Sequence, residues 1–247
     1  MHPTATREEA LRRLSDGMSV SECARLFGLA RSTVRSWRDG SLRGRPPECP
    51  RCDRIALDTE AYAALLGYYL GDGHLARARR QHALRVTCDL AYPAIIDDVV
   101  GLLGRVRPGH AVHQVSRLGC VVVQAHWRHW PCLFPQHGPG PKHARPIVLD
   151  DWQRAAVEAH PAEFLRGLFH SDGSRVANRV RRPVAGVMKY YVYPRWQFTN
   201  YSADIRELCC WALDLADVPW RQSNVHHISV STRAGVARLD GLVGLKQ

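Results

Sequence analysis

The stretch LLGYYLGDG at residues 65–73 recurs one hundred residues later as LRGLFHSDG at residues 165–173. Each copy is mostly apolar, with glycine at its third position, a small residue at its seventh, and Asp-Gly at its end. The third and seventh positions share one face of a helix. Because glycine inside a helix costs about 1 kcal/mol relative to alanine, two small residues on one face indicate that two helix backbones pack closely there.

The end of each copy places a carboxylate where a helix should stop. We predict that Gly73 and Gly173 adopt left-handed backbone and end the helices. Asp72 and Asp172 would then lie side by side. Because the C-terminus of a helix is already negative, paired carboxylates there favour a bound cation, and oxygen ligands suit Mg²⁺. Two ordinary Asp-Gly helix caps are the alternative, and the repetition of the whole pattern argues against it.

This tandem pattern resembles the signature of the LAGLIDADG homing endonuclease family over roughly residues 58–246. Both copies match at the first leucine, the central glycine and the closing Asp-Gly, and they depart at Leu70 and His170, where the signature has its first aspartate. The resemblance implies an α+β fold of two pseudo-symmetric αββαββα repeats, with saddle-shaped antiparallel sheets that straddle DNA. It also implies site-specific cleavage of double-stranded DNA, with Mg²⁺ or Mn²⁺ held by Asp72 and Asp172 to activate water and stabilise charge on the phosphate.

A basic residue near the metal is a further implication of the resemblance. Lys142 and Lys246 follow Asp72 and Asp172 by 70 and 74 residues, and each stands two residues after a glycine. We therefore take Lys142 as a catalytic candidate and Lys246 as its mate, with exposed surface lysines as the alternative. Two repeats in one chain predict a monomeric catalytic unit.

A different pattern precedes the first repeat. Ala24 and the turn residue Gly28 are four positions apart, and the apolar Val34 follows six positions later. This spacing is typical of a helix-turn-helix, in which a small residue lets two helices cross and an apolar residue packs the second helix back. A helical bundle without a DNA role is the alternative. Trp37 is expected in the core, and the side chains expected in the major groove are those of Arg31, Ser32, Thr33, Arg35 and Ser36.

The segment after this domain is rich in arginine, proline and glycine. Arg43 and Arg45 are its candidates for contact with phosphates or the minor groove. Cys49 and Cys52 form a CxxC pair, which is half of a zinc site and needs two more ligands to close a tetrahedron. Because the other cysteines contain no second CxxC pair, we expect a plain turn with reduced thiols here rather than bound zinc.

The domain boundaries and the DNA-reading strand follow from these patterns. In the second repeat, residues 188–199 are predicted to be extended, and Lys189, Arg195 and Gln197 are the candidates to read the major groove. The arginine-rich residues 179–182 are predicted to form a loop that touches the DNA backbone. We divide the chain into a helix-turn-helix domain (1–40), a linker (41–57), a first repeat (58–146) and a second repeat (147–247).

The composition agrees with a polyanionic partner. The 34 Lys and Arg residues outnumber the 23 Asp and Glu residues, for a net charge of +11 and a pI near 9.6, which favours nucleic acid. The sequence has no apolar run of transmembrane length, and its first residues are rich in Arg and Glu rather than typical of a signal peptide. We expect a soluble, cytoplasmic, nucleoid-associated protein whose eight cysteines are mostly reduced.

Two other functions are compatible with these patterns. Regulators of the WhiA type join a LAGLIDADG domain to a helix-turn-helix in the opposite order, and as a class they have lost catalytic acids. Here both acids survive, which favours a nuclease. An endonuclease embedded in an intein is disfavoured, because the chain begins with a helix-turn-helix and ends in VGLKQ without a His-Asn-Cys type of splice junction.

Overall fold

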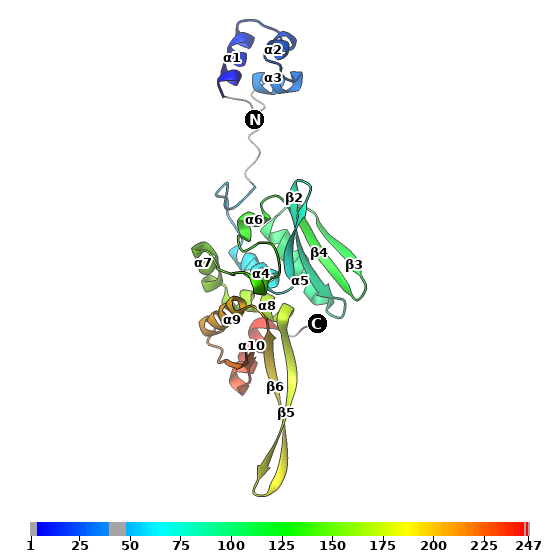
Figure 1. Cartoon of the computed structure of the whole chain (residues 1–247), viewed down its shortest axis with the longest axis vertical. Helices are drawn as coiled ribbons and strands as arrows, with labels where there is room; N and C mark the ends of the chain where they lie inside the picture. The colour runs from blue at the N-terminus through cyan, green and yellow to red at the C-terminus, as the bar shows by residue number, and fades with distance from the viewer. Residues whose placement is uncertain (1–3, 40–47, 245, 247) are drawn as a thin grey trace. The chain divides into compact units, whose positions relative to one another are not determined.

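The computed structural model describes residues 4–39, 48–244 and 246 of the 247-residue chain. These residues form two compact units, and the smaller one holds helices α1 (Thr4–Ser15), α2 (Val20–Leu26) and α3 (Arg31–Arg38) (Figure 1). The larger unit contains the rest of the chain from Ala56 together with the segment Cys49–Cys52. No helix among the described residues is long and apolar enough to cross a membrane.

The smaller unit has the predicted helix-turn-helix. Ser19 and Glu22 form a capping box at the start of α2, in which each side chain accepts a hydrogen bond from the other residue's backbone N–H. Gly28 has a φ of +61°, which glycine tolerates, and it turns the chain between α2 and α3. As predicted, the core includes the small residue of α2, the apolar residue of α3 and the tryptophan. The buried side chains are Ala10, Cys23, Ala24, Val34 and Trp37.

The larger unit repeats one arrangement of helices and strands twice. The first copy consists of α4 (Thr59–Leu70), β1 (Gly73–Ala78), β2 (Gln81–Asp89), α5 (Pro93–Val106), β3 (Val112–Arg117), β4 (Cys120–Trp127) and α6 (Trp130–Leu133), followed by the 3₁₀ turn η1 (Lys142–Ala144). The second consists of α7 (Asp151–Ala159), α8 (Pro161–Asp172), β5 (Gly173–Val184), β6 (Val187–Thr199), α9 (Ala203–Leu215), β7 (Arg221–Asn224), β8 (His227–Val230) and α10 (Arg233–Val243). The predicted α+β fold with a repeated αββαββα order is confirmed.

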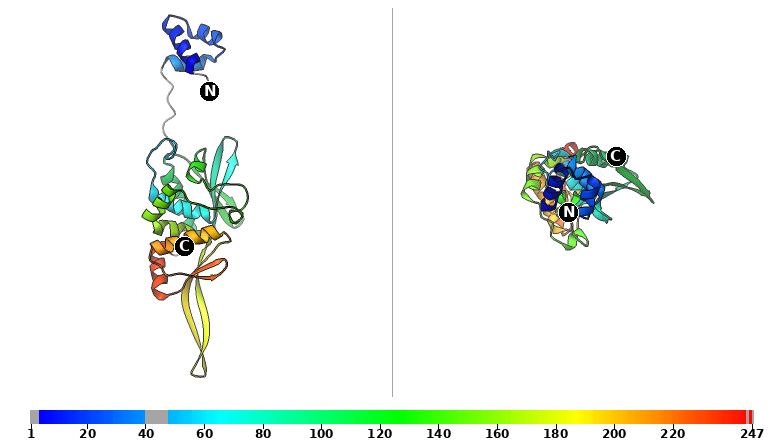
Figure 2. Two further views of the ribbon diagram at one scale, coloured as in Figure 1. Left: turned by 60° about the vertical axis from the view of Figure 1, so that its left-hand side comes forward. Right: turned by 90° about the horizontal axis from the view of Figure 1, so that it is seen from above.

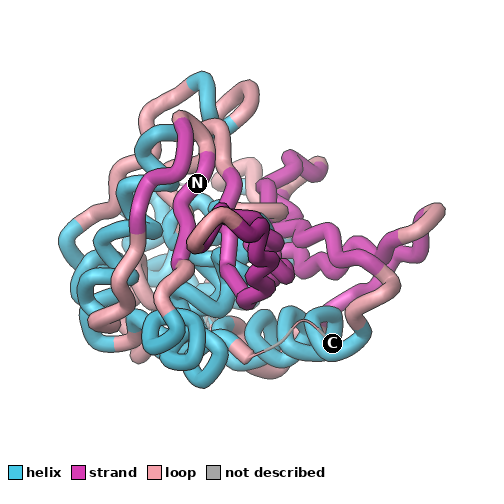
Figure 3. The backbone as a smooth tube through the Cα atoms, turned by 90° about the horizontal axis from the view of Figure 1, so that it is seen from below, coloured by secondary structure: helices cyan, strands magenta, loops and turns pink. Residues whose placement is uncertain are grey.

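The two sheets have equivalent topology. Their strand orders are β1-β2-β4-β3 and β5-β6-β8-β7, and all neighbouring strands are antiparallel. In β4, buried and half-buried residues alternate strictly, so one face of the sheet packs on helices and the other stays accessible. Figure 3 shows the strands of the larger unit gathered on one side and the helices packed along the other.

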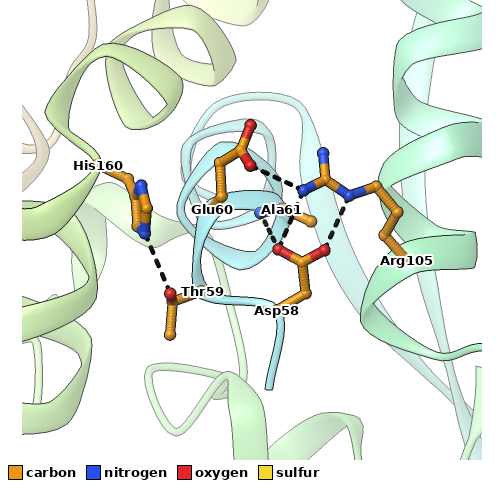
Figure 4. A network of polar contacts seen from close by, with 6 residues as sticks. All are labelled: Asp58, Thr59, Glu60, Ala61, Arg105 and His160. Carbon is orange, nitrogen blue, oxygen red and sulfur yellow. Dashed lines mark hydrogen bonds and ion pairs between the residues drawn. The ribbon is translucent and has the colours of Figure 1, made fainter. Parts of the chain in front are cut away.

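The starts of the two motif helices, α4 and α8, are linked by polar contacts (Figure 4). Asp58 caps the first turn of α4 and accepts two hydrogen bonds from the Arg105 guanidinium, at 2.8 and 3.1 Å. The Thr59 hydroxyl lies 3.1 Å from the imidazole Nε2 of His160, the residue that precedes α8. The first contact joins the start of α4 to α5, and the second joins it to the start of α8.

Helices α4 and α8 touch through their backbones at the predicted small residues. A Cβ placed on Gly67 would lie 2.4 Å from the carbonyl oxygen of Phe164, and one on Gly167 would lie 2.2 Å from that of Ala64. Both distances are far shorter than a van der Waals contact, so the packing requires glycine at both positions. The predicted close approach of two helix backbones is confirmed.

The predicted left-handed conformation of the last glycine in each motif is wrong. Gly173 has an extended backbone, with φ −91° and ψ 153°, and Gly73 likewise opens a strand and has no positive φ. The reason for glycine is space. A Cβ on Gly73 would lie 2.5 Å from the Cα of Tyr69, and one on Gly173 would lie 2.5 Å from the carbonyl oxygen of Phe169. Each strand therefore starts directly against the last turn of its own motif helix.

The arginine-rich residues 179–182 do not form the predicted loop. They lie within β5, which pairs with β6 along its whole length and turns back at Ala185 and Gly186, both of which have positive φ. The resulting ribbon extends well beyond the rest of the larger unit (Figures 1 and 2). Most residues near its tip are exposed on both faces, so the sequence there lacks the alternation that marks a half-buried strand.

Candidate functional site

The carboxylates of the two motifs are placed at adjoining helix ends. Asp172 is the last residue of α8, and Asp72 follows the residue that caps α4. At this level Gly71 packs against Ser171: a Cβ on Gly71 would lie 2.2 Å from the Ser171 Cβ and 3.4 Å from Asp172 Oδ2. The structure therefore brings both predicted acidic residues to one place, where the ends of α4 and α8 meet.

The protein around the two carboxylates disfavours their negative charge. Burial raises the pKa of Asp72, even though this residue keeps contact with solvent. Burial, together with the nearby Asp72 charge, raises the pKa of Asp172 to about 6, against the lowering effect of a 2.7 Å hydrogen bond from the Asn200 amide. Two desolvated carboxylates that repel each other are a donor set that fits a divalent cation with oxygen ligands.

Each predicted lysine lies at the end of one motif helix. Burial lowers the pKa of Lys142 to about 8, although Asp172 and Asp72 favour its charge. Lys246 donates to the carbonyl of Ser171 at 3.2 Å, and burial lowers its pKa as well. Positive charge at a helix C-terminus offsets the negative end of the dipole. The Lys142 ammonium donates to three backbone carbonyls of α4 and its cap, those of Tyr69 (2.6 Å), Leu70 (2.9 Å) and Gly71 (2.5 Å).

The two departures from the motif signature have different surroundings. Leu70 is completely buried in the apolar core. His170 contacts the Tyr68 hydroxyl through its Nδ1 at 2.9 Å, and this hydroxyl donates to Asp98 at 2.9 Å. Burial lowers the pKa of His170 to about 4, so its imidazole is neutral at physiological pH. A pocket of about 170 Å³ beside this network is lined by His170, Asp72 and Lys246, among others.

Sequence reasoning missed three polar residues at this site, Asn200, Asp98 and Tyr68. Asn200 stands 28 residues after the carboxylate that it contacts, and Asp98 stands 30 residues after Tyr68. Neither pair has a fixed local spacing, so only the fold brings the partners together. Asn200 follows β6 directly, and a strand end next to a motif aspartate is the one signal that could have identified it.

The predicted residues of the recognition helix lie on the accessible side of α3. Arg31, Ser32 and Arg35 are exposed, and Thr33 and Ser36 are half-buried. The buried Val34 and Trp37 occupy the opposite side. The two linker arginines, Arg43 and Arg45, lie outside the described residues.

The candidate DNA-reading residues of the second repeat lie on β6. Lys189 is exposed in the distal part of the ribbon. Arg195 and Gln197 are half-buried on the sheet face away from the helices, and they contact each other at 3.2 Å. The first repeat has an Arg–Gln pair that sequence reasoning did not select, although this one joins two strands: Arg85 on β2 donates to Gln124 on β4 at 2.9 Å. The alternation of buried residues in both strands was the signal that could have found it.

The structure places Cys49 and Cys52 beside two further metal-ligating side chains, His129 and Cys132. The expectation of a plain turn did not anticipate these neighbours. They are 77 or more residues away in the sequence, and one of them is a histidine rather than a thiol.

Comparison with known proteins gives one family match and several similar structures. Residues 6–41 match the family model of a helix-turn-helix domain. No curated protein is significantly similar in sequence to the chain. Similar solved structures include the LAGLIDADG meganuclease I-AabMI bound to uncleaved DNA, with 13% sequence identity, coverage of 73% of this chain and 82% of that chain, and a TM-score of 0.46.

Two further solved structures are similar to a comparable extent. The structure of I-DmoI in complex with DNA and Mn has 11% identity, with coverage of 76% of this chain and 99% of that chain and a TM-score of 0.48. The N-terminal LAGLIDADG domain of DUF199/WhiA has 13% identity, with coverage of 78% and 88% and a TM-score of 0.46. At these identities the likeness concerns the fold alone.

Proposed function

We propose that this chain is a site-specific, metal-dependent DNA endonuclease of the LAGLIDADG type, with its helix-turn-helix as an additional DNA-binding module. One observation carries the proposal. Two desolvated carboxylates, Asp72 and Asp172, lie at the touching ends of α4 and α8, and a lysine lies at each of these ends. A pair of neighbouring acids at two negative helix ends, where partial burial raises both pKa values, has no structural benefit, so a bound cation explains it best.

The residues of the site would divide the work as follows. Asp72 and Asp172 would hold Mg²⁺ or Mn²⁺, which supplies Lewis acidity for hydrolysis of a phosphodiester bond in each strand. Lys142 and Lys246 would offset the negative charge of both helix ends and of the phosphate. Because the Lys142 ammonium already donates to three carbonyls, we assign it to charge balance and positioning rather than to proton transfer.

The open faces of the two sheets would contact the DNA. Arginine and glutamine side chains suit the edges of guanine and adenine in the major groove, and the pairs Arg85–Gln124 and Arg195–Gln197 present both on equivalent faces of the two sheets. The arginines of β5 would contact phosphates, since they lie on an exposed ribbon. One chain supplies both carboxylates, so the catalytic unit would be a monomer. The proposed division of the chain is the one given by the sequence (1–40, 41–57, 58–146 and 147–247).

A randomised duplex library tests the proposed activity directly. Purified full-length protein is incubated with the library in Mg²⁺ or in EDTA, and both the bound DNA and the newly cut ends are sequenced. We expect cut ends only with Mg²⁺, all from one long, roughly twofold-symmetric site. Enrichment of the same uncut DNA in both conditions would contradict an endonuclease.

The helix-turn-helix favours a second candidate function, a DNA-binding regulator that does not cut. In that case Arg31→Ala and Arg35→Ala should abolish binding to one operator, because both side chains are exposed on the recognition helix. Asp72→Asn and Asp172→Asn should leave the DNA binding of such a regulator unchanged. For the nuclease, we expect the two arginine substitutions to weaken binding while Mg²⁺-dependent cutting persists at higher protein concentration. Titration of cleavage and of DNA binding for the same variants separates the two functions.

A further inference from the structure

A cluster of metal-ligating side chains lies away from the paired carboxylates. Cys49, Cys52, His129 and Cys132 each offer one ligand atom, and these four atoms all lie within 4.8 Å of one another. Three thiols and one imidazole form a common ligand set of structural zinc sites. The two halves have the spacings CxxC and HxxC, so the two ligands of each half are close together in the chain.

Three of the six distances between the ligand atoms are close to the edges of a zinc tetrahedron. With zinc bond lengths of about 2.3 Å to sulfur and about 2.0 Å to nitrogen, the edges are about 3.8 Å between sulfurs and about 3.5 Å between sulfur and nitrogen. The Sγ atoms of Cys52 and Cys132 are 3.5 Å apart, and each lies 3.6 Å from the Nδ1 of His129. A disulfide would need a separation of about 2.0 Å.

The ligands come from two supported segments of the larger unit. In the first, the backbone N–H of Cys52 donates to the Cys49 sulfur at 3.4 Å, the type of contact that orients and stabilises a metal-bound thiolate. In the second, His129 immediately precedes α6 and Cys132 lies within it. The carbonyl of Leu133 in α6 accepts a 2.6 Å hydrogen bond from the buried Tyr62 of α4, which fixes this short helix to the core.

We propose that these four side chains bind one Zn²⁺ ion in a closed, structural site. The ion would tie the segment that enters α4 to the corner between β4 and α6 of the first repeat. With zinc on Nδ1, the neutral imidazole keeps its proton on Nε2. The exposed Arg128, which now donates to that nitrogen at 2.8 Å, would therefore turn away. The site is independent of the carboxylates and of DNA cleavage.

The contact on the other side of the same loop indicates what the ion would stabilise. The Arg51 guanidinium stacks 4.5 Å from the ring centroid of Trp152 on α7, so the CxxC loop contacts both repeats. Zinc would hold this loop in place and thereby fix the point at which the preceding segment leaves the larger unit. Chelation should release the loop, and trypsin should then cleave faster after Arg51 and Arg54.

The test uses the full-length, untagged protein, reduced, loaded with Zn²⁺ and dialysed against metal-free buffer. We expect inductively coupled plasma mass spectrometry to find one zinc per chain. Loading with Co²⁺ instead should give the visible absorption of a tetrahedral site with thiolate ligands. Cys52→Ser should lower zinc affinity by more than about a hundredfold, since loss of a ligand exceeds the effect of an outer contact. Cys52 is exposed, so this variant should fold.

Matched variants and a second measurement keep the outcome clear. Cys132→Ser should lose zinc as Cys52→Ser does, whereas Cys120→Ser, which removes a half-buried thiol of β4 outside the cluster, should retain it. The circular dichroism spectrum of each variant establishes folding. Three results would each overturn the proposal. They are wild-type protein that holds no zinc after loading, equal zinc content in wild type and Cys52→Ser, and a Cys52–Cys132 disulfide in the native protein.

Discussion

Replacement of either motif aspartate by asparagine is expected to abolish Mg²⁺-dependent cutting while the protein stays folded. Asp72→Asn and Asp172→Asn each remove one charged oxygen of the proposed metal site. Loss of an outer metal contact costs roughly a hundredfold, and we expect cleavage to fall by well over that amount. Each substitution also removes one of two repelling, desolvated charges. The melting temperature without metal should therefore be unchanged or higher, and DNA affinity should be largely intact.

The combination of lost activity and retained stability separates a catalytic role from a structural one. If the aspartates were simple residues at helix ends, asparagine would leave cutting unaffected, because it is accepted there as well as aspartate is. Asp97→Asn is a suitable control, because this exposed carboxylate of α5 belongs to no proposed site. Gel-based cleavage and calorimetry on the same preparations provide both readouts. Normal cutting by Asp72→Asn would contradict the metal site.

Gly67→Ala and Gly167→Ala are expected to destabilise the larger unit by at least about 3 kcal/mol, because overpacking against rigid backbone exceeds the usual cost of an added methyl group. The added Cβ would collide with backbone of the opposite helix, at 2.4 Å from the Phe164 oxygen or 2.2 Å from the Ala64 oxygen. Neither oxygen can move without displacing its helix. Urea unfolding followed by circular dichroism measures the loss, and failure of either variant to fold would agree with it.

The same substitution in another helix of the protein should have the opposite sign. Gly101 and Gly104 lie within α5, and a Cβ on either would have no atom within 4 Å. Alanine there should stabilise the protein by about 0.5–1 kcal/mol for each site, because alanine has the higher helix propensity. Similar unfolding midpoints for Gly67→Ala and Gly101→Ala would show that helix packing at the motifs is looser than the structure indicates.

The features that could be predicted from sequence are those with a local pattern. The motif helices, their small contact face and the helix-turn-helix each depend on residues within one or two turns of each other. The spacing of Gly67 and Gly71 indicates a helix contact without any knowledge of the partner, and the repeat at residues 165–173 supplies that partner. The overall order of helices and strands was predicted from the family resemblance that the two motifs carry.

The features that were missed depend on contacts between distant segments or on exposure to solvent. His129 and Cys132 join Cys49 and Cys52 only because α6 packs beside the entry to α4. Asn200 reaches Asp172 only because β6 ends beside α8. The distal ribbon of β5 and β6 has no buried face, so nothing in its hydrophobic pattern distinguishes a strand from a loop.

The two hairpins that follow the motif helices differ in length, and this gives the molecule a direction. Strands β5 and β6 have 12 and 13 residues, whereas β1 and β2 have 6 and 9. The six additional residues of β5 relative to β1 add about 20 Å of strand, which equals the length of about six base pairs. A duplex bound across both sheets would be covered further on one side of the scissile phosphates than on the other. The protein would then bind each target in one orientation only. After cleavage it would cover one of the two DNA ends over a longer stretch than the other.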